Sequence, residues 1–343
     1  MKNTYTFDLQ LFANQVQTTL LSGLTPEMKT YYDMRLIDEA SAALVHDQFG
    51  QKRPIPANGG KTIEFRKFAP LAKALTPITE GVTPDGKSLS VSTITATVAQ
   101  YGDYITQSDV LELTALDNTI LEATKLLGKQ AGLTLDTVTR NVITGGTNVT
   151  YCPKVSAAGA ETAVTKRTDL DLTAKLTVKV IQKVVAKLRG QNAPTIGGKY
   201  VAIIHPYVAY DLMRDPEWID AHKYASPDNL YVGELGEIAG VRFVDSTEAK
   251  IWNDSTCPSD GSTGHYSVYS TLFLGEGAYG VTEITGGGLQ TIIKQKGSAG
   301  TADPLDQRSS VGWKAIKTAE ILIPNYLVRV ESCSPDFPAT AAN

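Results

Sequence analysis

The feature that most constrains the fold is a stretch of helical periodicity that runs from Thr106 to Thr144. Its apolar residues recur every three or four positions, which places them on one face of a helix: Leu113, Leu116, Ile120, Ala123, Leu127, Ala131, Leu135, Val138 and Val142. Thr106 and Asp109 resemble a capping box, and Gly145 and Gly146 provide a stop signal. Such a helix would be about 55 Å long. One compact core cannot enclose it, so we expect a spine helix that packs against several elements.

Two glycines lie inside this stretch, Gly128 and Gly132. Each costs about 1 kcal/mol relative to alanine in a helix interior, and packing of the apolar face must offset that free energy. The alternative interpretation is an ordinary core helix that breaks near the two glycines.

The overall composition limits the class of protein. The 343 residues are 42% hydrophobic and 20% charged, which allows a buried core and favours two domains. A net charge of -4 gives no general attraction for nucleic acid. Signals for export or a membrane span are absent from the sequence. Cys152, Cys257 and Cys333 are far apart and have no nearby histidine, so we expect neither disulfides nor a zinc site, as in a reducing cytosol.

Three elements are predicted before the spine helix. Residues 1–24 suit an arm, and the signals at Thr25 and Gly50 predict a helix between them. Residues 61–68 and 91–105 alternate like strands and are separated by turn residues, which predicts a long hairpin. No apolar layer is evident along it, and an isolated two-stranded ribbon is marginal in water, so we expect something outside the chain to hold it.

The residues after the spine predict a mixed α+β domain from 147 to 305. A helix is expected from Thr168 to Gly190, followed by a strand at 199–204 and a short helix at 207–214.

The C-terminal region returns to strand character from 312 to 330, with a bend at Pro324. The tail from 332 to 343 is rich in proline, alanine and threonine, and we expect it to be flexible.

Motifs that suggest catalysis are weak. Gly275–Gly280 matches G-x-G-x-x-G after a strand, but no helix signal follows that could hold a pyrophosphate, so a turn at the strand end is expected. His205 adjoins a buried strand and is expected to have a hydrogen-bonded structural role. The acidic residues near Trp218 are expected to form a solvated surface: Asp211, Asp215, Glu217 and Asp220. We predict no catalytic, cofactor-binding or metal-binding residue, and no cofactor.

Several short stretches carry a resemblance to a known family. They are LLSGLTPEM (20–28) with Tyr31 and Tyr32, GDYITQSD (102–109), GELGEIAGVRFVDS (233–246), DQRSSVGWK (306–314) and the opening FDLQLFA (7–13). Together they resemble the major capsid proteins of tailed double-stranded DNA bacteriophages, which have the Hong Kong 97 fold, and most closely the N-four-type branch.

The resemblance implies an α+β Hong Kong 97-type fold with defined parts. These are an N-terminal arm (1–55), an extended E-loop hairpin (56–105), the spine helix of the P-domain (106–146), an A-domain (147–305), C-terminal P-domain strands (306–331) and a flexible tail (332–343).

The implied function is structural, without enzymatic activity. Copies of the chain would form pentamers and hexamers of an icosahedral shell around phage double-stranded DNA, without sequence-specific binding and without a membrane. Scaffolding, portal and decoration proteins are further partners, and assembly would take place in the host cytoplasm. Five charged residues of the hairpin are predicted to meet opposite charges on a neighbouring subunit: Lys61, Arg66, Lys67, Glu80 and Lys87.

Three further hypotheses remain open. Some relatives crosslink a hairpin lysine to an asparagine, for which Lys73 or Lys87 with Asn325 are conceivable here, although nothing marks a carboxylate base. An encapsulin-type bacterial compartment would share the fold. A two-domain cytosolic enzyme would use the turn at Gly275–Gly280 to bind a nucleotide.

Overall fold

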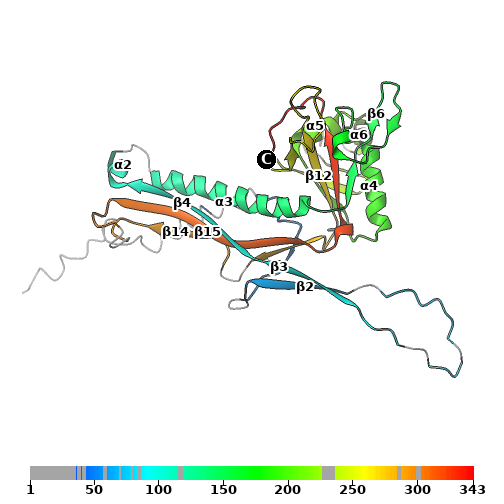
Figure 1. Cartoon of the computed structure of the whole chain (residues 1–343), viewed down its shortest axis with the longest axis horizontal. Helices are drawn as coiled ribbons and strands as arrows, with labels where there is room; N and C mark the ends of the chain where they lie inside the picture. Colours follow the sequence, from blue (N-terminus) through cyan, green and yellow to red (C-terminus); the bar gives the residue numbers. More distant parts are fainter. Residues whose placement is uncertain are drawn as a thin grey trace, which may run out of the picture. The chain divides into compact units, whose positions relative to one another are not determined.

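The structure is a computed structural model that describes residues 36, 40, 44–56, 60–68, 71–78, 80–83, 86–114, 119–225, 236–283, 287–298 and 303–343. They form two compact units. The first includes Gly102–Ala131 and Leu289–Ala315, and the second includes Ala42–Tyr101, Gly132–Gly288 and Ile316–Asn343. Helix α3 (Thr119–Thr144) and strand β15 (Arg308–Ile321) contribute residues to both units (Figure 1).

The first unit contains strands that pair along the N-terminal part of β15. Strand β14 (Gln290–Lys294) runs antiparallel to it, in the register Gln290↔Lys314 to Lys294↔Ser310. Strand β4 (Ala99–Ser108) also pairs with β15. The two backbones are so close that a Cβ atom on Gly102 would lie 2.6 Å from the carbonyl oxygen of Trp313. Glycine is therefore required at this position.

The first part of α3 lies against these strands. The amide of Gln130 donates to the Asp103 carboxylate on β4 at 2.7 Å, and its oxygen accepts from the indole N–H of Trp313 on β15 at 3.2 Å. One glutamine thus joins the helix to two neighbouring strands.

The expected spine helix starts later than predicted. Residues 106–108 belong to β4, and the helical residues form α2 (Asp109–Thr114) and α3, with residues 115–118 outside the described part. The cap is Ser108, whose hydroxyl accepts the N–H of Leu111 at 3.3 Å, so the capping box at Thr106 was wrong. Pairing of β4 with β15 holds Thr106 in an extended conformation.

The alternative of a helix broken at its glycines was also wrong, because the 26-residue α3 continues through Gly128 and Gly132. The helix stops before Gly145, as predicted, although neither Gly145 nor Gly146 has a positive φ. The predicted apolar face is buried at Ala123, Leu127, Ala131 and Leu135. Val138 and Val142 are only half-buried, because Thr139 and Ile143 take the inner positions, and Leu113 on α2 is exposed.

The predicted hairpin is present. Strands β2 (Thr62–Phe68) and β3 (Val91–Thr97) pair antiparallel in the register Thr62↔Thr97 to Phe68↔Val91. The second predicted strand, 91–105, divides at Val98, because the chain leaves the hairpin there and continues as β4 beside β15.

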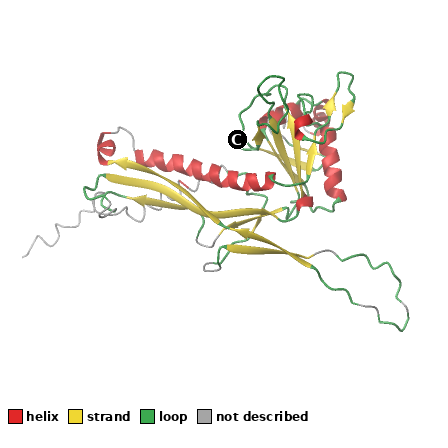
Figure 2. Cartoon of the chain, in the orientation of Figure 1, coloured by secondary structure: helices red, strands yellow, loops and turns green. Residues whose placement is uncertain are grey.

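The second unit contains a seven-stranded sheet in the order β5-β16-β12-β8-β10-β9, with β11 paired to β12 (Figure 2). The strands are β5 (Val149–Tyr151), β8 (Tyr200–Ile204), β9 (Glu237–Ile238), β10 (Val241–Asp245), β11 (Ile251–Trp252), β12 (Val268–Leu274) and β16 (Leu327–Cys333). Every residue of β8 and β12 is buried, and their residues are apolar apart from Ser270 and Thr271 of β12.

Three helices contribute to the core beside this sheet: α4 (Val178–Gly190), α5 (Pro206–Met213) and α6 (Pro216–Ala225). Their buried side chains form one cluster with those of the strands: Ile181, Val184, Leu188, Val208, Leu212 and Trp218 with Tyr200, Phe243, Phe273 and Val330. The predicted strand at 199–204 and helix at 207–214 are confirmed within one residue.

Helix α4 begins ten residues after the predicted start at Thr168. Residues 167–169 are a 3-10 turn, η2 (Arg167–Asp169), and the carbonyl of Ala174 accepts the N–H of Cys333 at the end of β16. This pairing keeps the segment extended. The helix start is capped from another element, since the Asp215 carboxylate accepts the N–H of Val178 at 3.0 Å.

The second unit also contains strands paired along the C-terminal part of β15 and a separate short ribbon. Strand β13 (Tyr279–Glu283) pairs with β15 antiparallel and with β1 (Gln51–Lys52) in parallel. A short ribbon is formed by β6 (Lys154–Val155) and β7 (Glu161–Thr162). The predicted bend at Pro324 is confirmed, because η4 (Pro324–Tyr326) separates β15 from β16.

Two expectations near the chain ends need correction. The helix predicted to end at Gly50 ends before residue 44, since residues 46–49 form turns, and of its earlier part only residues 36 and 40 are described. The tail was expected to be flexible. Instead, Phe337 stacks on Tyr207 with ring centroids 3.9 Å apart, and the Asn343 side chain accepts the N–H of Ile251 at 2.9 Å.

Candidate assembly interface

The hairpin has a root that is buried by its own chain. Phe65 is 5% exposed and, with Ala96, forms a buried cluster with Leu322, against which Ile63, Ile94 and Ile323 pack. A Cβ atom on Gly280 of β13 would lie 2.9 Å from the Phe65 ring. We call these side chains of β2 and β3, with Leu322 and Ile323, the hairpin root. The expectation that only an external partner holds the hairpin was therefore wrong for this part.

Beyond the root, the hairpin exposes apolar side chains. We call the described residues 71–78, 80–83 and 86–90 the distal loop, which extends past the ends of β2 and β3 (Figure 1). Leu75 is 82% exposed and Ile78 is 76% exposed, and Leu71, Val82 and Leu89 are also exposed. Several exposed apolar groups on one segment are a feature of interaction sites in soluble proteins. The sequence interpretation missed these residues, because they do not alternate with a strand period.

The five charged residues predicted for the interface all lie on the hairpin segment. Glu80 and Lys87 are exposed on the distal loop, Lys61 is exposed beside the start of β2, and Arg66 and Lys67 lie on β2 at the root. Arg66 is 4.0 Å from Glu64, and both side chains are exposed, so this ion pair contributes little to stability. Their contact with a neighbouring subunit stays a prediction.

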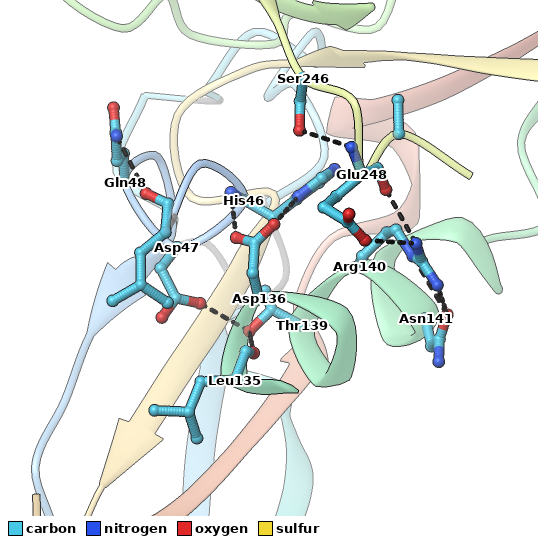
Figure 3. Close-up of polar contacts among 12 residues, drawn as sticks. His46, Asp47, Gln48, Leu135, Asp136, Thr139, Arg140, Asn141, Ser246 and Glu248 are labelled. Carbon is cyan, nitrogen blue, oxygen red and sulfur yellow. Dashed lines mark hydrogen bonds and ion pairs between the residues drawn. The ribbon is translucent and has the colours of Figure 1, made fainter. Parts of the chain in front are cut away.

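A buried polar network joins the second half of α3 to the segment at 44–49 (Figure 3). The fully buried His46 and Asp136 share two hydrogen bonds, at 2.7 Å from the His46 backbone N–H and at 2.6 Å from its Nδ1. The hydroxyl of Tyr279 on β13 donates to the carbonyl of His46. Burial raises the pKa of Tyr279, which keeps this donor protonated.

The same network continues along α3. Asp47 accepts from the Thr139 hydroxyl at 2.6 Å and from the ammonium group of Lys317 on β15, which also donates to the carbonyl of Leu135 at 3.2 Å. On another side of the helix, Arg140 donates to the carbonyl of Glu248 at 2.9 Å. The charges of Asp47, Lys317 and Arg140 are compensated inside the chain, so the arrangement fixes the helix position.

A second buried carboxylate ties the end of the large sheet together. Glu331 on β16 accepts from Arg167 at 2.6 and 2.7 Å, and its carboxylate forms an ion pair with Arg329 at 2.9 Å. The guanidinium of Arg167 also lies 3.9 Å from the ring centroid of Trp252 on β11. Two arginines and an aromatic ring surround one carboxylate, and this group of contacts stabilises the fold.

The candidate catalytic groups have structural roles. His205 caps α5, since its Nδ1 accepts the N–H of Tyr207 at 3.2 Å, and burial lowers its pKa to about 4, as expected for a structural histidine. The predicted acidic surface was wrong for Asp211, which is buried with a raised pKa, and for Asp215, which caps α4.

The glycine motif is a turn between two strands. Strand β12 ends at Leu274 and β13 begins at Tyr279, so no helix follows Gly275. A Cβ atom on Gly275 would lie 2.9 Å from the carbonyl oxygen of Pro194, and Gly277 has φ of 70°. These glycines serve the turn, which removes the basis of the nucleotide-binding hypothesis.

The described residues carry neither a metal-ligand cluster nor a membrane-spanning helix. They contain no group of three or more potential metal ligands. Among them, no helix is both long and apolar enough to cross a bilayer. The three cysteines are free and buried.

The described elements include an anchored hairpin, a long helix and a mixed sheet, and a comparison with protein families assigns them. A sequence model described as phage capsid protein matches residues 8–297. The chain belongs to the phage capsid protein family. A search of curated proteins finds no match.

Solved phage capsids share the fold of this capsid protein. The capsid of Ralstonia phage GP4 aligns with a TM-score of 0.64 and 14% identity, over 85% of this chain and 89% of that one. The capsid of cyanophage P-SCSP1u aligns with a TM-score of 0.63 and 14% identity, over 83% and 87%. Cyanophage Pam1 gives 0.63 and 12%, over 86% and 92%. The capsid protein therefore has the Hong Kong 97 fold, as the sequence resemblance implied.

The family match decides between two of the earlier alternatives. It identifies a structural major capsid protein of a phage, and the encapsulin-type compartment is the weaker alternative. A structural capsid family is also not an enzyme family.

Proposed function

We propose that copies of this chain assemble into pentamers and hexamers of an icosahedral shell that encloses phage double-stranded DNA, and that the chain has no enzymatic activity. The observation that carries the proposal is the distal loop, which exposes apolar side chains on a hairpin whose root is anchored. A neighbouring subunit would bury these side chains. The five parts assigned by resemblance, from N-terminal arm to C-terminal strands, belong to this proposal.

The charge of the subunit agrees with a container for DNA. Its net charge is -4, whereas proteins that bind nucleic acid tightly carry a basic surface. Confinement and counterions hold a packed polyanion inside a closed shell, so the wall needs no strong attraction for it. Binding to DNA would be independent of sequence.

The predicted contacts of the hairpin follow from the same assembly. Lys61, Arg66, Lys67, Glu80 and Lys87 would meet charges of opposite sign on the neighbour, while the apolar side chains supply most of the free energy. Scaffolding, portal and decoration proteins would be further partners. Assembly would occur in the cytoplasm of the bacterial host, and the final location is the virion.

Electron microscopy of the purified chain, together with sedimentation at several concentrations, tests this proposal. We expect closed shells or rings of five and six subunits, and a scaffolding protein can be co-expressed if the chain needs one. Replacing Leu75 and Ile78 with serine should raise the concentration needed for assembly more than tenfold, because each buried leucine or isoleucine contributes about 1.5 kcal/mol or more.

The matched control is Val155→Ser, on the exposed edge of β6, which should assemble like the unchanged chain. Monomers under every condition, with and without a scaffold, would contradict the proposal. Normal shells from the Leu75 and Ile78 variant would remove the distal loop from the interface.

A further inference from the structure

The hairpin root contains a cavity of about 160 Å³ that the function above does not use. Its apolar part is formed by Phe65, Ile94 and Leu322. All residues that line it belong to the second unit, so the cavity is a property of that unit alone. We call it the root cavity. Its size and lining suit one aliphatic side chain.

The rim of the root cavity is basic. Arg53, Arg66 and Lys67 contribute to its lining. The guanidinium of Arg53 lies 5.9 Å from the centroid of the Phe65 ring, which places a cation beside the apolar floor. Glu64, 4.0 Å from Arg66, is the nearby carboxylate, and that exposed pair is weak. The cavity therefore favours an apolar group that carries negative charge next to it.

The first unit has an exposed surface that combines apolar side chains with acidic residues. Helix α2 and the turn at 303–307 lie side by side, since the N–H of Asp109 donates to the carbonyl of Gln307 at 2.9 Å. Leu113 is 81% exposed and Leu305 is 75% exposed, and Val110 and Leu111 are exposed beside them. We call α2 with residues 303–308 the acidic tip.

The charge of the acidic tip is opposite to that of the cavity rim. Its sequence carries Asp109, Glu112, Asp303 and Asp306 against the single cation Arg308. Asp303 is buried and lies 3.8 Å from Arg308, so this carboxylate is compensated within the tip. Asp306 is exposed next to Leu305. An apolar side chain flanked by an exposed carboxylate is the partner that the root cavity favours.

We propose that the acidic tip of one copy docks into the root cavity of a second copy, with a leucine of the tip on the apolar floor and its carboxylates facing Arg53, Arg66 and Lys67. This inference rests on the proposed self-assembly and adds a contact to it. The distal loop is a less suitable occupant, because Lys73, Glu80 and Lys87 give it charges of both signs. Charge complementarity selects the acidic tip and sets its orientation.

Paired cysteines test the contact. Lys67→Cys is combined with Leu305→Cys, and in a second chain with Leu113→Cys, and assembled particles are treated with a short bismaleimide crosslinker. The native Cys152, Cys257 and Cys333 are buried, so the new thiols react first. We expect linked dimers and higher multimers on a denaturing gel from at least one pair. Each single variant should give only the monomer band.

The matched control pairs Leu305→Cys with Lys87→Cys on the distal loop, and it should stay unlinked. Particles without links in either test pair would overturn the contact and leave the shell function intact. Links from Leu305→Cys alone would mean that two tips meet, which also overturns it. Monomers in all conditions, without links, would contradict both the contact and the proposed function.

An exchange of charges tests the orientation. Arg66→Glu and Asp306→Lys should each weaken assembly about tenfold, and the double variant should recover most of that loss, because opposite charges face each other again. Light scattering against subunit concentration measures it. A double variant no better than the weaker single variant would contradict the proposed pairing.

Discussion

The root and the distal loop of one hairpin differ in whether the chain itself buries their apolar side chains. Phe65 at the root packs against Leu322 and Gly280 of the same chain, whereas Leu75 and Ile78 of the distal loop are exposed. Burial of apolar surface stabilises the first region in the free subunit. The second region can gain that free energy only from a partner. The hairpin thus has a root that is held by its own chain and a distal loop whose apolar surface stays exposed in the free subunit.

The largest expected effect is a difference in the free energy of unfolding between a substitution in the root and one in the distal loop. Phe65→Ala should lower the free energy of unfolding by about 3–4 kcal/mol, because it leaves a cavity in a packed cluster. Leu75→Ala should change it by less than about 0.5 kcal/mol and weaken assembly instead. Chemical denaturation of the free subunit measures both. Equal destabilisation by the two variants would contradict the distinction.

A buried hydrogen-bonded pair and an exposed ion pair provide the same comparison for polar groups. Asp136→Ala should cost about 3 kcal/mol, because it leaves the buried His46 without either hydrogen bond. Glu64→Ala removes the exposed partner of Arg66 and should cost less than about 0.5 kcal/mol. Denaturant midpoints at fixed pH give both values. A stable Asp136→Ala subunit would show that the network of Figure 3 does not hold α3.

Two glycine-to-alanine substitutions test the same difference by adding one methyl group to each region. Gly280→Ala should destabilise the subunit by about 2 kcal/mol, since its Cβ would lie 2.9 Å from the Phe65 ring. Gly86→Ala is the control, because no atom lies within 4 Å of an added Cβ in the distal loop. Thermal unfolding of the two variants, compared with the unchanged chain, reports the difference. Loss of stability only in Gly86→Ala would reverse the assignment of the two regions.

The smallest expected effect is a pH dependence that belongs to the buried core and not to the distal loop. The folded pKa of His205 is about 4 against an ordinary value of 6.5, so the unfolded chain binds the extra proton between these values. Stability from this group is complete above pH 6.5 and is lost as pH falls toward 4.

Denaturant titrations at several pH values measure this slope. His205→Asn keeps an N-cap residue and should reduce the slope between pH 6.5 and 4. An unchanged slope would assign the acid sensitivity to other groups.

Local patterns were sufficient for much of the fold. Ala123, Leu127, Ala131 and Leu135 form the buried face of α3 as their spacing predicts, and the alternation at 61–68 identifies β2. Boundaries were less predictable where distant residues decide them. Thr106 has a helix signal but stays in β4 because β15 pairs with it, and α4 starts at Val178 because Asp215 caps it.

The candidate interface was only partly predictable for a related reason. Charged residues of the hairpin could be named, but the exposure of Leu75 or Leu305 depends on what the rest of the chain leaves uncovered. Asp136 interrupts the apolar face of α3, which was the available signal for the buried network, yet its partner His46 is 90 positions away. Sequence spacing carries no information on such a pair.

Burial of the distal loop by a neighbouring subunit should protect a thiol placed at position 75, so the reactivity of that thiol reports on the interface. Leu75→Cys is labelled with a maleimide in free subunits and in assembled particles, with Val155→Cys as the control. We expect fast labelling in free subunits and labelling at least about tenfold slower in particles, while the control changes little. Equally fast labelling at position 75 in both states would contradict this burial.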